Sequence, residues 1–360
     1  MTPGSAKRIL IAPLDWGLGH TTRCIPFIRQ LLELKHEVYF AGNDSQQTFV
    51  AKLFPGITLL TLGGYGVRYG HRWLMPSLLR QIPRLASRIR SEHKWLLDTV
   101  LHEKIDAIIS DNRYGLWHPG IPSVILTHQA EIRTGFGGWA DGILRLMHYR
   151  MLRRFSACWI VDIVGPENLG GDLSHPSVLP QNARYIGWIS QLNPPDAEQR
   201  RQHLLILLSG PEPQRSMLSD MLWDQACGLE APVVFVEGKA SAIRTHVPGH
   251  ITHITRTGGA QLQSLLEGAT IVVCRSGYST LMDLILLRKK AILIPTPGQT
   301  EQEYLARRLR KQGIFYAAPQ QGFSLEAALA KAEQFPYLIP DANGNHEAYR
   351  KVVTEWVSTF

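Results

Sequence analysis

Short apolar runs alternate with longer segments in which apolar residues recur at helical spacing. The first run, Arg8–Pro13 (RILIAP), predicts a buried strand, and a helix is expected from about Thr22 to Leu34. Such alternation is typical of βαβ units with mainly parallel sheets. Further strands are expected at residues 37–41, 57–62, 105–110, 123–127, 157–162, 203–208, 232–237, 270–274 and 290–295.

A polar stretch with two adjacent prolines, residues 190–202 (SQLNPPDAEQRRQ), separates two α/β halves of similar size. A chain of 360 residues is long enough for two domains, each with its own core. We therefore expect an N-terminal domain, a linker, a C-terminal domain, and a last helix that packs back toward the N-terminal domain. Their expected ranges are 1–190, 191–202, 203–340 and 341–360.

Composition and cysteine content indicate the cellular compartment of the protein. With 44% hydrophobic and 19% charged residues, the chain is typical of globular proteins. The four scattered cysteines include no CxxC pair, as expected for reduced thiols in an intracellular protein. No apolar segment predicts a signal peptide or a membrane-spanning helix. We expect a cytoplasmic protein.

The net charge of +8 lies mostly in the first half. Residues 1–170 hold 20 Lys and Arg against 13 Asp and Glu, whereas residues 171–360 hold 18 against 17. A basic half fits an acidic partner, which can be anionic lipid, a phosphorylated acceptor or nucleic acid. Few interleaved aromatic residues and no nucleic-acid motif argue against RNA and DNA.

One segment, residues 71–95, concentrates this charge. Apolar residues recur there at helical spacing, Arg80, Arg84 and Arg88 follow one side, and Trp73 and Trp95 flank it. A basic amphipathic helix of this kind can lie on the inner face of an anionic membrane. The alternative is a core helix with a solvated basic face. Pro83 is expected to kink the helix in either case.

The strongest chemical signal is in residues 269–309. A strand runs into Arg275, Ser276 and Gly277, and a helix starts near Tyr278. Small residues at the turn and free N–H groups at the helix start suit a diphosphate around residues 276–280, which include Ser279 and Thr280. The alternative is a capped helix without a ligand.

Acidic and amide side chains follow this turn. Asp283, one or two helical turns further on, can accept hydrogen bonds from a ribose diol. The next strand leads into a loop and a helix that carry groups suited to sugar hydroxyls, namely Gln299, Thr300, Gln302 and Glu303. Without a ligand, these residues would form a capped helix with a solvated face.

The order of these residues resembles glycosyltransferase family 28, and within it the MurG branch. The shared features are VVCRSG, an acid six residues after its glycine, a strand that ends in proline, and polar residues on the next helix. The resemblance implies an α/β GT-B fold, in which two Rossmann-like domains with parallel sheets face each other across a cleft. It also implies a nucleotide-sugar donor, of the UDP type, in the C-terminal domain.

In that family, Ser276 and Gly277 would line the diphosphate, Asp283 would bind the ribose hydroxyls, and Gln302 and Glu303 would meet the sugar. The MurG branch has glutamate in place of Asp283 and glutamine in place of Glu303, and the second departure leaves the identity of the sugar open.

A second loop supports the resemblance. Ser209 and Gly210 follow the strand at 203–208, where the family's loop approaches the donor phosphates. Nearby prolines depart from the MurG pattern. Arg215 either offers a cation to the diphosphate or lies on a solvated helix face.

The N-terminal half begins with another glycine loop, PLDWGLGH, in which Gly17 and Gly19 allow a tight turn on the acceptor side. Thr22 stands where a GxGxxG motif needs its third glycine, so a dinucleotide site is not expected. The loop loosely resembles the family's GGTGGH loop. Because that sequence is absent, the resemblance implies a bacterial relative of MurG rather than MurG itself.

Inverting sugar transfer needs a base for the acceptor hydroxyl. His20, in the loop after the first strand, is the expected base because histidine titrates near neutrality. Asp111, at the end of another strand, orients His20 or is itself the base, and His128 is the next candidate. No DxD sequence occurs, so neither a divalent metal nor another cofactor is expected.

Two other functions remain open, since fold does not fix reaction. A nucleotide-sugar hydrolase or epimerase would turn over a sugar nucleotide without an acceptor. A non-catalytic nucleotide-sugar-binding protein would keep its function without His20 and Asp111. The lead prediction is an inverting, metal-independent transferase that acts on an unknown, lipid-linked or otherwise anionic acceptor.

Overall fold

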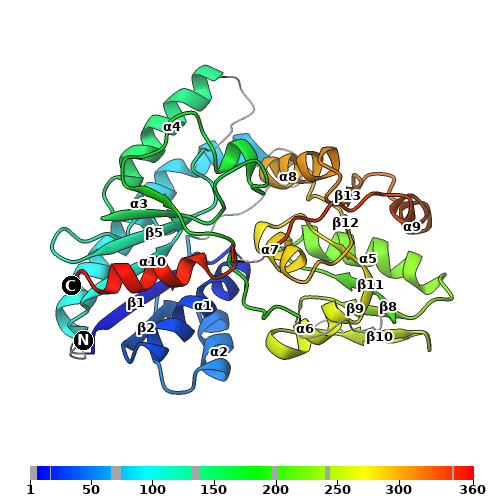
Figure 1. The fold of residues 1–360 in the computed structure, drawn as a ribbon, viewed down its shortest axis with the longest axis horizontal. Coiled ribbons are helices and arrows are strands. Elements are labelled where there is room, and N and C mark those ends of the chain that lie inside the picture. Colours follow the sequence, from blue (N-terminus) through cyan, green and yellow to red (C-terminus); the bar gives the residue numbers. More distant parts are fainter. Residues whose placement is uncertain are drawn as a thin grey trace. The chain divides into compact units, whose positions relative to one another are not determined.

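A computed structural model of the chain describes residues 6–16, 18–65, 74–131, 138–195, 202–239, 244–342 and 344–360. It contains two compact units, residues 1–189 with 344–360, and residues 190–343. Each unit holds one parallel sheet with helices packed on it (Figure 1). The two sheets confirm the expected class of two Rossmann-like α/β domains.

The N-terminal unit has a seven-stranded sheet with the order β3-β2-β1-β4-β5-β6-β7. From β1 the chain builds outward through β2 and β3, and it then returns to place β4 on the other side of β1. This reversal makes the carboxyl ends of β1 and β4 a topological switch point, where open α/β sheets bind ligands. The strands are β1 Arg8–Pro13, β2 Glu37–Gly42, β3 Thr58–Thr61, β4 Ala107–Asp111, β5 Ser123–Thr127, β6 Ala157–Ile160 and β7 Ala183–Tyr185.

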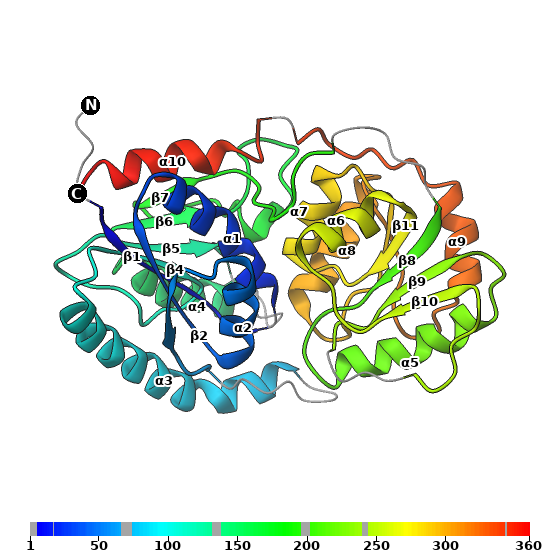
Figure 2. The same cartoon turned by 90° about the horizontal axis from the view of Figure 1, so that it is seen from below.

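Helices cover both faces of this sheet. On one face α3 contributes Leu96 to a cluster with Leu10 and Ile108 from the central strands, and α1 and α10 cover the opposite face (Figure 2). Burial of these aliphatic side chains contributes most of the packing free energy. The helices of the unit are α1 Leu18–Glu33, α2 Asp44–Leu53, α3 Leu74–Glu103, α4 Gly138–Leu152, the short 3₁₀ helix η1 Gly171–Leu173, and α10 Ala348–Val357.

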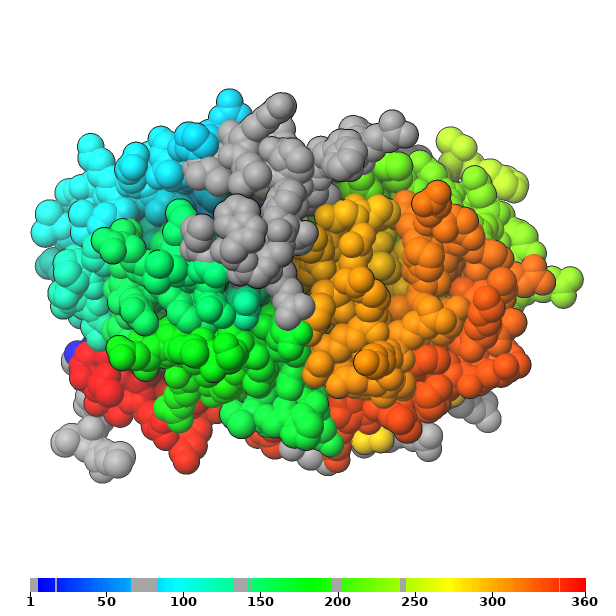
Figure 3. All heavy atoms as spheres, turned by 90° about the horizontal axis from the view of Figure 1, so that it is seen from above, coloured from blue at the N-terminus to red at the C-terminus, as the bar shows by residue number. Residues whose placement is uncertain are grey.

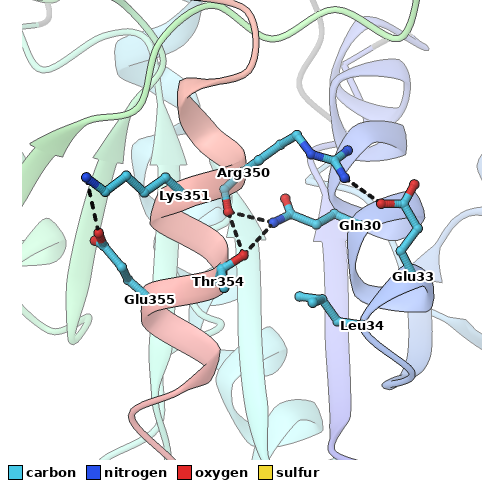
Figure 4. A pocket seen from close by; sticks show the side chains of 7 residues that line it. All are labelled: Gln30, Glu33, Leu34, Arg350, Lys351, Thr354 and Glu355. Carbon is cyan, nitrogen blue, oxygen red and sulfur yellow. Dashed lines mark hydrogen bonds and ion pairs between the residues drawn. The ribbon is translucent and has the colours of Figure 1, made fainter. Parts of the chain in front are cut away.

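The C-terminal helix α10 belongs to the N-terminal unit and packs beside α1. Tyr349 of α10 meets Phe27 of α1 edge to face, with ring centroids 5.4 Å apart. Gln30 of α1 donates to the backbone oxygen of Arg350 at 2.6 Å, and Arg350 pairs with Glu33 at 2.5 Å (Figure 4). The shallow pocket between the two helices is therefore crossed by hydrogen bonds of the fold itself.

The C-terminal unit has a six-stranded sheet with the order β10-β9-β8-β11-β12-β13. Here the chain reverses between β8 and β11, so the carboxyl ends of these two strands form a second switch point. The strands are β8 His203–Leu207, β9 Val233–Val236, β10 Ile251–Ile254, β11 Ala269–Cys274, β12 Ala291–Leu293 and β13 Tyr316–Ala317. The helices are α5 Gln214–Cys227, α6 Gly259–Glu267, α7 Tyr278–Leu286, α8 Thr300–Lys311 and α9 Leu325–Glu333.

The main differences from the sequence-based prediction are local. Helix α1 begins at Leu18, before the expected start at Thr22, and Pro83 lies inside the continuous helix α3. The strands β7, β10 and β13 were not predicted, because they have only two to four residues and little apolar periodicity. Within the described ranges, no helix is both long and apolar enough to cross a bilayer.

Candidate functional site

The N-terminal switch point brings together polar side chains from three elements. Pro13, the last residue of β1, pairs with Asp111, the last residue of β4. His20 lies in the first turn of α1, so the expectation that it belongs to a loop is wrong. Gly19 lies in the same turn, where its backbone oxygen accepts from the Thr22 hydroxyl at 3.0 Å, and Gly17 lies outside the described residues.

Hydrogen bonds connect four side chains at this point. His20 Nδ1 lies 3.0 Å from Asp111 Oδ2. Arg23, one turn further along α1, pairs with Asp111 through Nη2 and Nε. Its Nη1 lies 2.9 Å from Nδ1 of His128, which follows β5. The structure therefore joins all three predicted catalytic residues into one cluster around Arg23, in which Asp111 and His128 are buried and the His20 side chain is 14% exposed.

Sequence reasoning missed Arg23. Its side chain is only 1% exposed, although arginine is seldom buried without a partner. Two signals in the sequence point to it. Arg23 is three residues after His20, hence on the same side of a helix, and it precedes the apolar run Cys24–Ile28 that faces the core.

Asp111 is ionised in this cluster. Burial alone would raise its pKa, but the Arg23 guanidinium and the His20 ring together lower it to about 2. A carboxylate next to His20 can hold the ring in one orientation and stabilise its protonated form, as in other histidine–carboxylate pairs. This arrangement can support proton transfer at His20 Nε2.

A second buried ion pair supports the loop after β4. Glu92 of α3 accepts from Arg113 Nε at 2.5 Å and from the Tyr65 hydroxyl at 2.6 Å. Arg113 also donates to the backbone oxygens of Pro13 at 3.1 Å and Gly63 at 2.5 Å. These bonds tie the end of β1 to the loop that leaves β4, so they fix the backbone on both sides of Asp111.

The C-terminal switch point exposes two glycines. Leu207 of β8 pairs with Cys274 of β11, so the loops that carry Gly210 and Gly277 leave the sheet next to each other. At both glycines, apart from the glycine and its two neighbours along the chain, no heavy atom of the described residues lies within 4 Å of the position that a Cβ would take. Gly277 is also the N-cap of α7. Open backbone at a helix start is the arrangement that binds phosphate.

Several predicted donor residues are instead used by the fold. Ser276 is buried and donates to the backbone oxygen of Gln302 at 2.8 Å. The buried guanidinium of Arg275 donates to the backbone oxygens of Gln214, Ile294 and Pro295 and to the Gln320 side chain. Tyr278 is 3% exposed and packs into the core. These three residues shape the turn around Gly277, and the accessible positions there are Gly277, Ser279 and Thr280.

Arg215 is in neither of its two expected positions. It is buried, it pairs with Glu212 of the preceding turn, and it donates to the backbone oxygen of Gly238 at 2.6 Å. It therefore braces the loop after β8, in which Ser209 and Gly210 are exposed.

Asp283 is half-buried on α7 and accepts a hydrogen bond from the Ser190 hydroxyl at 2.5 Å. Burial raises its pKa to about 7, and the bond from Ser190 acts in the opposite direction. Asp283 thus titrates near neutrality, with one carboxylate oxygen held by Ser190.

The loop between β12 and α8 is held by side chains of that helix. Gln302 Oε1 accepts from the backbone N–H of Thr296 at 2.9 Å, and Glu303 Oε1 accepts from that of Gly298 at 2.8 Å. Gln302 is buried, Glu303 and the N-cap residue Gln299 are half-buried, and Thr300 is exposed. Only the last three therefore present accessible side chains to a ligand.

The basic segment at residues 71–95 lies partly outside the described residues. Trp73 belongs to that part, and no side chain is described for Arg80. On α3, Arg84 and Arg88 are exposed, whereas Trp95 packs against the core. Helices α3 (cyan) and α4 (green) both reach the surface on the face of the N-terminal unit shown in Figure 3.

Comparison with known proteins finds sequence similarity in the C-terminal part of the chain. The glycosyltransferase family 28 C-terminal domain matches residues 254–351. A UDP-N-acetylglucosamine–N-acetylmuramyl-(pentapeptide) pyrophosphoryl-undecaprenol N-acetylglucosamine transferase of Caldanaerobacter subterraneus is 30% identical over 93 residues, 25% of each chain. The enzyme of the same name from Desulforudis audaxviator is 44% identical over 55 residues, 15% of each chain. The chain thus matches a quarter or less of the length of these relatives.

Solved structures match over nearly the whole chain. The glycotransferase of kitacinnamycin superposes with a TM-score of 0.68 at 14% identity, over 99% of this chain and 100% of the other. MurG of Acinetobacter baumannii gives 0.54 at 14% identity, over 97% and 99%. At such identities the likeness establishes the fold. The chain therefore has the two-Rossmann-domain GT-B fold, and its residues 254–351 are similar to the C-terminal domain of glycosyltransferase family 28.

Proposed function

We propose that this protein is an inverting, metal-independent glycosyltransferase that moves a sugar from a nucleotide-sugar, of the UDP type, to an acceptor hydroxyl. The observation that carries the proposal is the open backbone at Gly210 and Gly277, at a switch point next to the segment that matches family 28. The positive end of the α7 helix dipole, with its backbone N–H groups, favours the diphosphate, which gains negative charge as it leaves.

The rest of the donor would be bound by accessible polar groups of the same unit. Asp283 accepts from the ribose diol, and Glu303, Gln299 and Thr300 are suited to sugar hydroxyls. Relatives that match part of this chain are named for a UDP-sugar donor and a polyprenyl-linked acceptor, which supports both ligand classes here. The basic N-terminal half fits an anionic or lipid-linked acceptor.

The N-terminal unit would supply the base. His20 Nε2 takes the proton of the acceptor hydroxyl as the oxygen attacks the anomeric carbon, and the bond from that carbon to the diphosphate breaks. Asp111 stabilises the imidazolium that forms. Attack from the face opposite the leaving group inverts the anomeric centre. His128, whose Nδ1 lies 2.9 Å from Arg23 Nη1, is the second candidate base.

The test is release of UDP from a panel of UDP-sugars in EDTA, with and without a lipid extract of bacterial envelopes as acceptor source. We expect release that depends on the extract. His20→Ala should lower it by about 10²–10⁴-fold, the typical contribution of a general base, without changing the affinity for the donor. His102→Ala, at an exposed position of α3, is the matched control. Equal release without any acceptor would indicate a hydrolase, and full activity of His20→Ala would refute the proposed base.

A further inference from the structure

His20 Nδ1 lies between two groups that make opposite demands on it. It is 3.0 Å from Asp111 Oδ2 and also 3.0 Å from Arg23 Nη2. An ionised carboxylate can only accept a hydrogen bond, and a guanidinium can only donate one. A single ring nitrogen cannot satisfy both at once, because it either carries a proton or offers a lone pair.

The two choices put the ring in different chemical states. If Nδ1 carries the proton, it donates to Asp111, and Nε2 has the lone pair that a base needs. If Nδ1 is bare, it accepts from Arg23, and the proton of the neutral ring is on Nε2, where it blocks proton uptake. Whether Nδ1 bonds to Arg23 or to Asp111 therefore decides whether the neutral ring is the inactive or the base-competent tautomer.

Arg23 is well placed to influence this contest. Its guanidinium is 1% exposed and is held by Asp111 on one side and by Nδ1 of His128 on the other. Cys24 lies near both Arg23 and Asp111, and Tyr114 lies near Asp111; burial raises the pKa of each, so both stay neutral near pH 7. His128 is neutral while its Nδ1 accepts from Arg23. Arg23 and Asp111 therefore supply the charges that act on the His20 ring in this cluster.

We propose that Arg23 is a positioning residue that competes with His20 for the Asp111 carboxylate and so sets how much of His20 has a bare, basic Nε2. The role in catalysis rests on the proposed function, in which His20 is the base. The effect on the tautomer does not, because it follows from the hydrogen bonds alone.

The direct test is ¹⁵N NMR of protein labelled at histidine, since imidazole nitrogen shifts differ between the two neutral tautomers. The His20 signals are assigned with His20→Gln, and exposed His102 is the internal reference. We expect wild-type His20 to populate both neutral tautomers, and Arg23→Gln to shift it toward the one with the proton on Nδ1. Unchanged His20 shifts in a folded Arg23→Gln protein would overturn the inference.

The pH dependence of kcat/KM gives a second readout. Without the guanidinium, Asp111 favours the imidazolium, so the acidic limb should move about one unit toward higher pH, a tenfold loss of kcat/KM below it. Arg23→Lys keeps the cation and should keep the limb within about 0.3 units of wild type. Arg23→Lys also provides the tautomer test if Arg23→Gln does not fold. One lysine nitrogen cannot replace the three guanidinium nitrogens that bond to Asp111, His20 and His128, so the His20 tautomer should shift in this variant too.

The two proposals fail in different ways. Full turnover in His20→Ala with a tautomer shift in Arg23→Gln would remove His20 as the base and leave the effect of Arg23 intact. Turnover that needs His20, with neither a tautomer shift nor a moved acidic limb in both Arg23 variants, would refute only the role of Arg23.

Discussion

At the scale of single residues, the surroundings shift the pKa values of two carboxylates in opposite directions. Asp111 is buried beside a guanidinium and has a pKa of about 2, whereas burial raises the pKa of Asp283 to about 7. From the sequence we predicted Asp111 at the end of a strand and Asp283 near the start of a helix. We also predicted that Asp111 could orient His20. The sequence could not show Arg23 between them, because that contact joins residues 88 positions apart.

The raised pKa of Asp283 predicts a pH-dependent affinity for the donor. The carboxylate accepts from both ribose hydroxyls, whereas the protonated form loses one acceptor. Affinity for a UDP-sugar should therefore fall about tenfold between pH 8 and pH 6, as the ionised fraction falls through a pKa of about 7. Isothermal calorimetry at both pH values measures this, and Asp283→Asn should show little pH dependence.

Truncation of the same side chain tests its contact with the ligand. Asp283→Ala should weaken binding of the UDP-sugar at pH 8 by about 10–100-fold, the usual loss for a hydrogen bond to a charged group. Asp224→Ala, at an exposed position of α5 in the same unit, is the control. Equal affinities of wild type and Asp283→Ala would remove Asp283 from the donor site.

At the scale of elements, the helix that begins after Gly277 carries the donor hypothesis. Its start near Tyr278 was predicted because an apolar strand is followed by small residues and then by a helical pattern. The structure confirms this start. The sequence could not separate residues that face a ligand from residues that build the turn. Arg275 and Ser276 match the family pattern, yet Arg275 bonds to the backbone after β12 and Ser276 to the backbone of α8.

Gly277→Val tests this helix start. The backbone of Gly277 has a φ of −75°, which any residue adopts, and the open space around it admits a larger side chain without a clash. The fold should therefore tolerate valine while the added methyl groups block the phosphate, and affinity for UDP should fall at least tenfold. Gly249→Val, also at an open glycine, should bind as wild type. Normal binding by Gly277→Val would place the phosphate elsewhere.

Helix α3 carries the membrane hypothesis. Arg84 and Arg88 are exposed, and each basic residue near an anionic surface contributes about 1 kcal/mol. Arg84→Glu with Arg88→Glu should lower binding to vesicles of phosphatidylglycerol and phosphatidylcholine by at least tenfold at low salt, in a sedimentation assay. Glu substitutions at Arg307 and Arg310, exposed on α8, are the control. If the wild-type protein does not bind these vesicles, the membrane hypothesis is wrong and α3 is a core helix with a solvated face.

At the scale of the whole molecule, alternation of apolar runs was enough to predict two parallel α/β units. Strands β1 and β5 have the predicted bounds, because their apolar residues are continuous and buried on both faces. The order of the strands was not predictable from this pattern. That order decides where the switch points fall, and with them which loop residues meet.

The chain end contributes to this architecture through α10. Tyr349 is 7% exposed and packs on Phe27, so Tyr349→Ala should lower the free energy of unfolding of the N-terminal unit by about 3–5 kcal/mol. Lys351→Ala, at a side chain that is 81% exposed, should change it by less than about 0.5 kcal/mol. Denaturant unfolding followed by fluorescence measures both, and equal stability of the two variants would mean that α10 adds little to the unit.

The central claim is that the C-terminal unit binds a nucleotide-sugar. It is tested most directly by calorimetric titration of the purified protein, in EDTA, with UDP and then with UDP-, GDP-, CDP- and dTDP-sugars. The account predicts saturable binding of the uridine class, with one site per chain and an affinity that Gly277→Val weakens. Absence of binding by every nucleotide, in protein shown to be folded, would contradict it.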